Sequence, residues 1–277
     1  MAEFHPLRSK HDLENDPAWE ILNAAAEKLA RNEPTASLPS LDHLTYSDYQ
    51  NVYEPADDTY LLTDCLQYEF RQGQFRIQNC ETSANGRITR VLEIGGGSGV
   101  PSVFFRMQWN ELNTTTTLSP RAIHSIVTDV NPYALQATKQ TAAANGIDIQ
   151  EASFQTVQCD LASDLLPAQA GKVDVILFNP PYVPTPDEEV GGTGIEASWA
   201  GGIRGRRVVD RAVGQMAQLL RKPNGVAYMI TVDDNRPVEL SGLFGNVGLT
   251  MRPLFRRRAH NEYLTVQKLT WSAPILL

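Results

Sequence analysis

The sequence predicts an α/β fold built on an open, mostly parallel sheet. Short apolar stretches bounded by turn residues alternate with amphipathic stretches long enough for helices. The stretch 173–178 is apolar at five of its six positions, as expected of a strand buried on both faces of a parallel sheet. Polar residues directly follow several strands, at the edge of such a sheet where ligands bind.

Composition limits the classes of protein that fit. The 277 residues lie within the range of one large α/β unit. The apolar content of 42% and charged content of 20% are ordinary for a soluble globular protein. A net charge of −8 and an isoelectric point near 5.2 argue against a broad phosphate-binding surface but leave room for a local basic patch.

Three widely spaced cysteines (Cys65, Cys80 and Cys159) form neither a metal motif nor a disulfide framework, which indicates a reducing compartment. Five scattered histidines predict no metal site. Residues 1–6 lack the apolar core of a signal peptide, and no apolar run approaches the length of about 18 residues that a membrane span needs. We therefore expect the protein in the cytoplasm, with the nucleus as a further location.

Residues 1–45 differ in composition from residues 46–277, which we expect to form the main domain. Asp16 and Pro17 are typical of an N-cap and a first helical residue, and the apolar spacing after them predicts an amphipathic helix over 17–31. A linker with Pro34 and Pro39 follows. The helix either packs on the main domain or docks a partner.

Residues 53–62 read Tyr-Glu-Pro-Ala-Asp-Asp-Thr-Tyr-Leu-Leu. Asp57 or Asp58 can cap a helix that begins there. Alternatively, this segment closes over a cofactor, with Glu54, Asp57 and Thr59 as candidate contacts.

The first core strand is predicted at 89–94, and it runs into the glycine-rich turn 95–99 and a helix over 101–112. Such a turn brings the backbone close to a ligand. Its glycines are more tightly spaced than in dinucleotide-binding turns, and Glu93 precedes them. A carboxylate there repels a pyrophosphate and suits a cationic ligand that carries an amino group and a sulfonium. The candidate contacts are Glu93, Gly95, Gly97 and Gly99.

The next two strands also end at acids. The second, at 123–127, leads to Asp129 and Val130, and an acid there can bind both ribose hydroxyls. Asp129 could instead cap the helix predicted over 132–144, a role that Asn131 would serve as well. The third strand, Phe154–Cys159, is short and alternating, which favours a position near the sheet edge. It leads to Asp160 and Leu161, suited to an adenine amino group or to capping a turn.

The fourth strand, 173–178, ends at the sequence Asn179-Pro180-Pro181-Tyr182. The prolines stop strand pairing. The carbonyl groups of Asn179 and Pro180 can together accept both hydrogens of a planar –NH2 group, so that its lone pair faces an electrophile. The Tyr182 ring can cover one face of that group. The alternative is a simple stop after a buried strand, with Asn179 as a turn residue.

A long loop over 183–206 follows and is a candidate substrate wall. Further elements are predicted as a helix at 208–221, a strand at 226–232, a helix at 237–246 and strands at 249–255 and 263–269. Arg256–Arg258 would lie between the last two strands, as a solvated turn or as a patch that steers an acidic substrate.

With these segments placed, the chain resembles class I S-adenosylmethionine-dependent methyltransferases. More closely, it resembles the HemK-type protein glutamine methyltransferases of the eukaryotic branch that modifies the translation termination factor. The resemblance spans about residues 46–270 and is carried by the segments 53–59, 92–99, 128–132, 179–184 and 199–202. The Asn-Pro-Pro-Tyr loop is shared with adenine-N6 enzymes, whereas Tyr-Glu-Pro and Trp-Ala-Gly-Gly are more specific to this branch.

The resemblance implies a Rossmann-like, seven-stranded sheet with helices on both faces and an antiparallel last strand. It implies that Gly95, Gly97, Asp129 and Asp160 contact S-adenosyl-L-methionine. It further implies that Asn179 and Pro180, with Pro181, Tyr182 and Trp199 nearby, hold the glutamine of a Gly-Gly-Gln motif in the class-one release factor. A small zinc-binding activator subunit would pair with the third strand, and any zinc would belong to that partner. The extension 1–45 and the insertion 113–121 depart from the family pattern.

Other functions compete with this interpretation. Adenine-N6 methyltransferases of nucleic acids usually carry a recognition domain or a basic face, neither of which is evident here. Protein lysine methylation fits a planar amide clamp less well. A cofactor-binding scaffold without activity would not require Asn179, Pro180 and Tyr182 to be present together.

Overall fold

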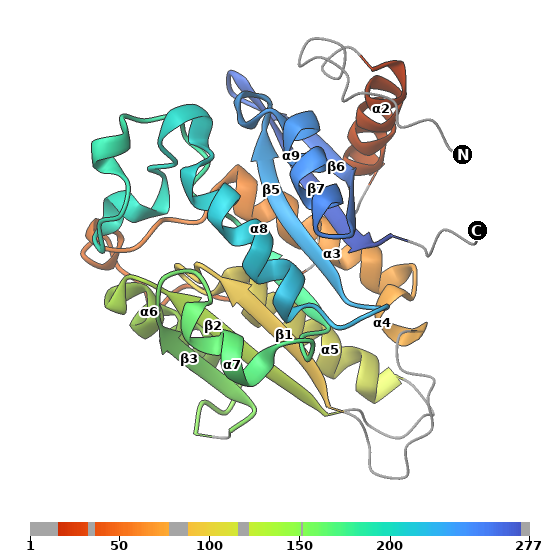
Figure 1. Ribbon diagram of the computed structural model, residues 1–277. Helices are drawn as coiled ribbons and strands as arrows, with labels where there is room; N and C mark the ends of the chain where they lie inside the picture. Colours follow the sequence, from red (N-terminus) through yellow and green to blue (C-terminus); the bar gives the residue numbers. More distant parts are fainter. Residues whose placement is uncertain (1–15, 33–36, 78–87, 116–121, 151, 273–277) are drawn as a thin grey trace.

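The computed structural model describes residues 16–32, 37–77, 88–115, 122–150 and 152–272, so Cys80 and residues 1–15 lie outside the description (Figure 1). Seven strands form one sheet in the order β3-β2-β1-β4-β5-β7-β6. Their bounds are β1 Thr89–Ile94, β2 Ile123–Asp129, β3 Phe154–Gln158, β4 Val175–Phe178, β5 Val226–Val232, β6 Leu249–Ala259 and β7 Glu262–Trp271. Strands β1 to β5 pair in parallel, and β7 is antiparallel to both of its neighbours. The seven-stranded, mostly parallel sheet is thus confirmed.

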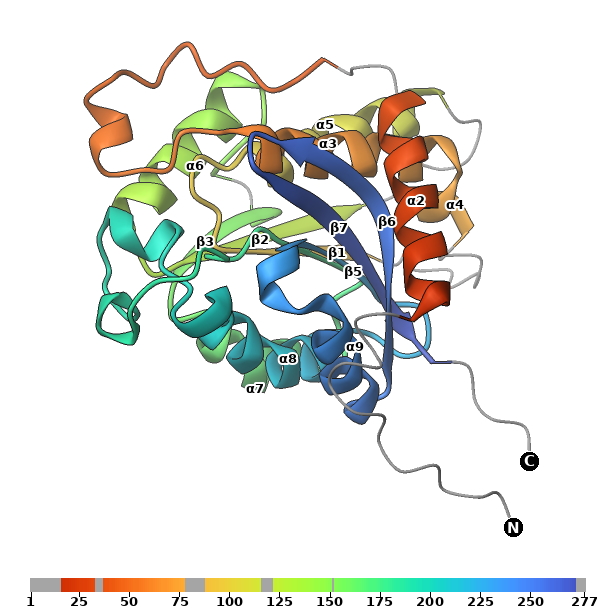
Figure 2. The same ribbon diagram turned by 90° about the horizontal axis from the view of Figure 1, so that it is seen from above.

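Helices cover both faces of the sheet (Figure 2). The helices are α2 Pro17–Asn32, α3 Asp57–Arg71, α4 Gln74–Ile77, α5 Val100–Thr115, α6 Pro132–Ala144, α7 Leu166–Gln169, α8 Arg207–Leu219 and α9 Pro237–Asn246. On one face, Leu66 of α3 and Phe104 of α5 pack on a core that includes Val175 of β4. On the other, Met216 of α8 and Phe244 of α9 share a core with β4 and β5. Burial on both faces explains why β4 is continuously apolar and why β5 is apolar at every position except Thr231.

Several predicted elements agree with the structure to the residue: β1, β5, α6 and α9. Helix α5 is longer than predicted, so residues 113–115 of the expected insertion are helical and the rest lies outside the described residues. Strand β4 begins at Val175, because Val173 pairs instead with Leu220 as an isolated bridge. Strand β3 lies at the sheet edge, as its short alternating pattern predicts.

The prediction that Arg256–Arg258 form a turn is wrong. These residues lie in β6, and the chain turns at 260–261. Arg256 pairs with Asp233, and its guanidinium lies 4.4 Å from the centre of the Tyr263 ring. Arg257 pairs with Asp64 at 2.7 Å. These long-range partners hold a charged sequence in an extended conformation.

The N-terminal helix α2 packs along β6. Trp19 and Leu29 lie against the two different cores, and Ala30 is buried in one of them. The segment after the linker covers α6, where Leu44 and Val52 pack on Ala137. None of the described helices is long and apolar enough to cross a bilayer.

Candidate active site

A cavity of about 250 Å³ opens at the carboxyl ends of β1, β2 and β4. It lies where the strand order reverses between β1 and β4, the place where open α/β sheets bind ligands. Ten of the candidate site residues line it: Thr59, Glu93, Gly95, Gly97, Asp129, Val130, Asp160, Leu161, Asn179 and Pro181. The strand-end residues are therefore brought together as expected.

The glycine-rich turn presents its backbone to this cavity. Gly95 and Gly97 have φ values of +71° and +53°, and a Cβ built on either meets open space. Gly99 has a different role. Its φ is +81°, and a Cβ there would lie 2.9 Å from the Thr138 Cα of α6. Gly99 thus allows the turn to pack against α6 and does not line the cavity, contrary to its predicted ligand contact.

Asp129 holds the shape of this turn. Its two carboxylate oxygens accept the N–H groups of Gly97 at 2.9 Å and Asn131 at 2.8 Å. Burial raises the pKa of the Asp129 carboxyl. Asn131 caps α6 by accepting the Tyr133 N–H, so the capping role belongs to Asn131. Each Asp129 oxygen still has capacity for a further donor from a ligand.

Glu93 lies at the end of β1 and is 2% exposed. Its carboxyl accepts the Ser102 N–H at 3.0 Å. Burial raises the pKa of Glu93 to about 8, so the apo protein holds this group mostly neutral at pH 7. The group therefore ionises readily when a cation enters the cavity.

Asp160 is an exposed wall residue that forms an ion pair with Arg211 of α8. Arg211 also lines the cavity and was not predicted from the sequence. Leu161, beside it, has a φ of 55°. At this wall, Arg211 is therefore a hydrogen-bond donor and Asp160 is an acceptor.

Asp58 is a further site residue that the sequence prediction did not identify. Glu54 and Asp57 are exposed and lie outside the cavity lining, whereas Asp58 is buried. Asp58 accepts hydrogen bonds from the hydroxyls of Tyr53 and Tyr182 and from the Thr59 N–H. The α3 N-cap is Ala56, so neither Asp57 nor Asp58 is the N-cap residue, and the Asp58 carboxylate binds the Thr59 N–H from within the first turn.

Asp58 also orients Asn179. The Asn179 Nδ2 donates to Asp58 Oδ2 at 3.0 Å. Asn179 Oδ1 is buried and has no hydrogen-bond partner among the residues that the structure describes. A buried acceptor without a donor costs about 1–3 kcal/mol, which a ligand N–H would recover. Asn179 Oδ1 is therefore an oriented carbonyl oxygen that can accept a hydrogen bond from a ligand N–H.

The two tyrosines beside Asp58 remain neutral. Burial and the neighbouring Asp58 charge raise the pKa of Tyr53 and of Tyr182 far above neutrality. Tyr53 lines the cavity, while Tyr182 and Pro180 do not. The Tyr182 hydroxyl lies 3.2 Å from Asp58 Oδ2.

The loop 183–206 folds back over the cavity. The loop residues in the lining are Gly191, Gly192, Gly194, Ile195, Ala197, Ser198 and Ala200. Val183 pairs with Ala200 as an isolated bridge, and an ion pair between Asp187 and Arg207 ties the loop to α8. Trp199 lies outside the lining, with 38% of its surface exposed, so the structure does not bring it to the cavity.

No family model matches the chain. The chain is 37% identical to "Methyltransferase HEMK2" of Mus musculus over 239 residues, which cover 86% of this chain and 99% of that protein. It is 29% identical to "eRF1 methyltransferase catalytic subunit mtq2" of Schizosaccharomyces pombe, over 84% of this chain and 95% of that protein.

Among solved structures, the chain is similar to Mtq2 in the E. cuniculi Mtq2–Trm112 complex, which is responsible for methylation of the eRF1 translation termination factor. The TM-score is 0.51 at 26% identity, over 80% of this chain and 99% of that one. A ribosomal protein L11 methylase from Lactobacillus delbrueckii, at a TM-score of 0.50 and 13% identity, shows the shared fold. Since the identity to the mouse protein is 37% over nearly its whole length, this chain belongs to the HEMK2 methyltransferase family.

Proposed function

We propose that this protein methylates the side-chain amide of the glutamine in the Gly-Gly-Gln motif of the eukaryotic class-one translation termination factor. The observation that carries the proposal is the buried Asn179 Oδ1, an oriented acceptor without a donor at the end of β4. The names of the relatives support it. One is an eRF1 methyltransferase subunit, and another, from Methanocaldococcus jannaschii, is a "Putative protein N5-glutamine methyltransferase" at 32% identity.

The residues around the cavity fit S-adenosyl-L-methionine. Backbone at Gly95 and Gly97 faces open space, and the buried Glu93 carboxyl suits a cationic group. Asp129 would hold the ribose hydroxyls, and the Asp160 wall would meet the adenine. The cofactor would supply an electrophilic methyl group. Glu93 at the end of β1 and Asp129 at the end of the neighbouring strand β2 would bind its cationic and ribose parts.

Residues of this chain would orient the glutamine amide of the substrate. Asn179 Oδ1 and the Pro180 carbonyl would accept the two amide hydrogens, which turns the nitrogen lone pair toward the methyl group. The neutral Tyr182 ring would cover one face and favour the developing positive charge. A methylated amide nitrogen releases its proton readily, so the neutral Tyr53 and Tyr182 need not act as bases.

We further propose that the protein works as the catalytic subunit of a heterodimer with a small zinc-binding activator. Support comes from the complex in which the similar Mtq2 chain is paired with Trm112. Strand β3 is a sheet edge, and an unpaired edge is a template for another chain. We expect the chain to be poorly soluble when expressed alone. A stable, active monomer would contradict the need for a partner.

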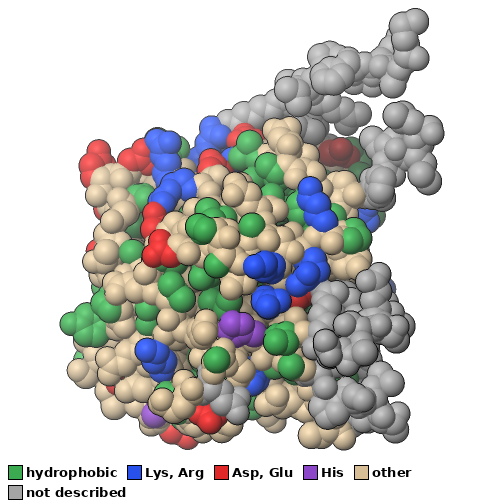
Figure 3. All heavy atoms as spheres, turned by 60° about the horizontal axis from the view of Figure 1, so that its bottom comes forward, with side chains coloured by type: hydrophobic (Ala, Val, Ile, Leu, Met, Phe, Trp, Pro, Cys, Tyr) green, Lys and Arg blue, Asp and Glu red, His purple; other side chains and the backbone are tan. Residues whose placement is uncertain are grey.

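The charge distribution does not favour a nucleic-acid substrate. The net charge is −8. On the face in Figure 3, the Lys and Arg side chains drawn among the described residues lie in small groups, with uncharged and acidic side chains between them. An enzyme that binds a duplex and flips a base usually carries a broad basic surface.

A methyl-transfer assay with the co-expressed activator tests the proposal. Three substrates are compared: the intact release factor, the same factor with its Gly-Gly-Gln glutamine changed to alanine, and an adenine-containing duplex. We expect label on the first alone. Label on the alanine variant would indicate a lysine or another residue, and label on the duplex would indicate adenine-N6 methylation. Either result would overturn the proposal.

A further inference from the structure

A buried asparagine, Asn235, binds the backbone of the Asn179–Tyr182 loop, which we call the reaction loop. Asn235 follows β5 and is completely buried. Its Nδ2 donates to the carbonyl oxygens of Tyr182 and Arg204, each at 2.9 Å. Its Oδ1 accepts the Val232 N–H at 2.8 Å. One side chain therefore ties the Asn179–Tyr182 loop to the end of β5 and to the returning part of the loop 183–206.

The backbone approaches the same carbonyl too closely for any side chain. Gly205 has a φ of +64°, and a Cβ there would lie 1.7 Å from the Tyr182 oxygen. Gly201 packs in the same way, because a Cβ built on it would lie 2.5 Å from the Pro181 carbonyl oxygen. Two glycines of the returning loop thus pack directly on two successive carbonyls of the reaction loop.

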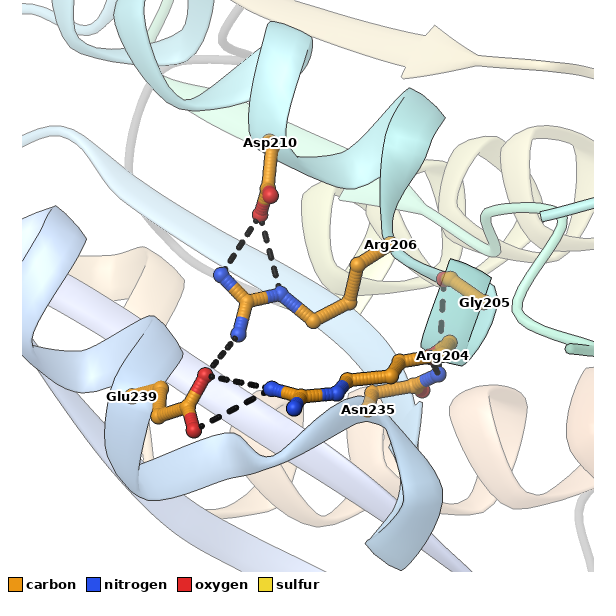
Figure 4. Close-up of polar contacts among 6 residues, drawn as sticks. All are labelled: Arg204, Gly205, Arg206, Asp210, Asn235 and Glu239. Atoms are coloured by element: carbon orange, nitrogen blue, oxygen red, sulfur yellow. Dashed lines mark hydrogen bonds and ion pairs between the residues drawn. The ribbon is translucent and has the colours of Figure 1, made fainter. Parts of the chain in front are cut away.

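An ion-pair network fixes this returning segment (Figure 4). The Arg206 guanidinium donates to Asp210 of α8 at 2.8 Å and 3.0 Å and to Glu239 of α9 at 2.9 Å. Arg204 reaches the same Glu239 at 3.3 Å. The Arg206 side chain is only 11% exposed, so these contacts are partly shielded from solvent. Arg204 and Arg206 are therefore anchored to helices, while Asn235 binds the carbonyls of Arg204 and Gly205.

We propose that Asn235 is a positioning residue for methyl transfer, acting through the Tyr182 carbonyl. This inference rests on the proposed function of the Asn179–Tyr182 loop. Tyr182 is held at both ends, by Asp58 at its hydroxyl and by Asn235 at its backbone oxygen. The two contacts fix the ring and, through the short rigid Pro-Pro segment, the Pro180 carbonyl. Misplacement of a reacting group by about 1 Å can cost about 10²-fold in rate.

Asn235→Asp tests this role with little change of shape. The variant keeps an acceptor for the Val232 N–H but puts a carboxylate oxygen where Nδ2 donates to Tyr182 and Arg204. Asn246→Asp, an exposed residue at the end of α9, is the matched control. With the co-expressed activator, we expect kcat for Asn235→Asp to fall about 10- to 100-fold, with cofactor affinity unchanged. The control should keep wild-type kcat. If kcat per folded enzyme stays at the wild-type value while thermal stability falls, Asn235 is merely structural.

Gly205→Ala is a second test, which can be used if Asn235→Asp does not fold. Its added methyl group would push against the Tyr182 carbonyl oxygen. Its control is Gly214→Ala in α8, where an added Cβ meets nothing within 4 Å. We expect the same loss of kcat for Gly205→Ala and none for the control. Crystal structures of the variants give a readout that needs no substrate. A Tyr182 carbonyl that stays in place would overturn the proposal. The proposed function itself is tested separately: it fails if the wild-type enzyme does not label the glutamine.

Discussion

Asn179 Nδ2 lies 3.0 Å from Asp58 Oδ2, across 121 residues of sequence. This contact decides which way the Asn179 amide points, because a carboxylate accepts and does not donate. Oδ1 is left facing away from Asp58, buried and without a partner among the described residues. An acidic side chain on the first turn of α3 therefore sets which atom of the Asn179 amide is left without a partner at the end of β4.

Asp58→Asn should disrupt catalysis. The new amide can donate as well as accept, so Asn179 would no longer be held with Oδ1 outward. We expect kcat to fall about 10²-fold while cofactor affinity is retained. The control is Asp57→Asn, the adjacent exposed acid, which should behave as wild type. Single-turnover kinetics and calorimetry provide the two measurements. Equal rates for the two variants would show that Asp58 does not orient the loop.

Asn179→Ala should abolish transfer and leave cofactor binding largely intact. Loss of a single preorganised hydrogen-bonding group typically costs about 10²–10³-fold in kcat. Transfer to the release factor and cofactor titration are measured side by side, with Asn246→Ala as the exposed control. Full turnover by Asn179→Ala would refute the amide clamp.

Asp129→Ala should weaken cofactor binding by about 1–3 kcal/mol, the value of hydrogen bonds to a charged group. The Gly97 N–H also loses its acceptor, so the glycine-rich turn becomes less well ordered. Calorimetry gives the affinity. Asp148→Ala, an exposed acid beyond α6, is the control and should bind as wild type. Unchanged affinity for Asp129→Ala would remove its ribose role.

Glu93 predicts a pH dependence of cofactor binding. Its pKa in the apo protein is about 8, and a bound cation favours the charged form. Binding at pH 7 should therefore release a proton, and affinity should rise with pH up to about 8 and then level off. Calorimetry in buffers of different ionisation enthalpy measures the proton. Glu93→Gln should show no such release. A buffer-independent heat for the wild type would contradict the prediction.

The same shift predicts the pH dependence of folding stability. In the unfolded chain Glu93 ionises near 4.5, whereas in the fold it ionises near 8. Between these values the native state binds the extra proton, so the Glu93 contribution to the free energy of unfolding is complete below 4.5 and is lost as pH rises through 8. Glu93→Gln should flatten this part of the profile in denaturant titrations of the complex. A profile unchanged by Glu93→Gln would exclude Glu93 as its source.

Much of the fold could be predicted because its signals are local. β1 is a buried strand that ends at glycine, and α6 begins at Asn131-Pro132, so both carry their own boundaries in sequence. The alternation of strands and helices then gives a parallel sheet, and the strand-end residues Asp129 and Asn179 meet at one edge.

The partners of individual side chains could not be predicted in this way. Successive residues of a helix differ by about 100° in direction, so the packing of α3 decides that Asp58 faces the site and Asp57 faces solvent. Asn235 sits in the polar sequence Asp-Asp-Asn-Arg, which looks like an ordinary turn until the fold brings it to Tyr182.

By itself, the sequence determined the succession of strands and helices along the chain, the glycine-rich turn and the Asn179–Tyr182 loop. These features depend on residues that are neighbours along the chain. The tertiary structure decided which acid orients Asn179, which glycine serves packing, and which residue holds the Tyr182 carbonyl. The physical reason is that hydrogen bonds and close contacts are made within about 3–4 Å, between residues whose separation in sequence sets no limit on their distance in the fold.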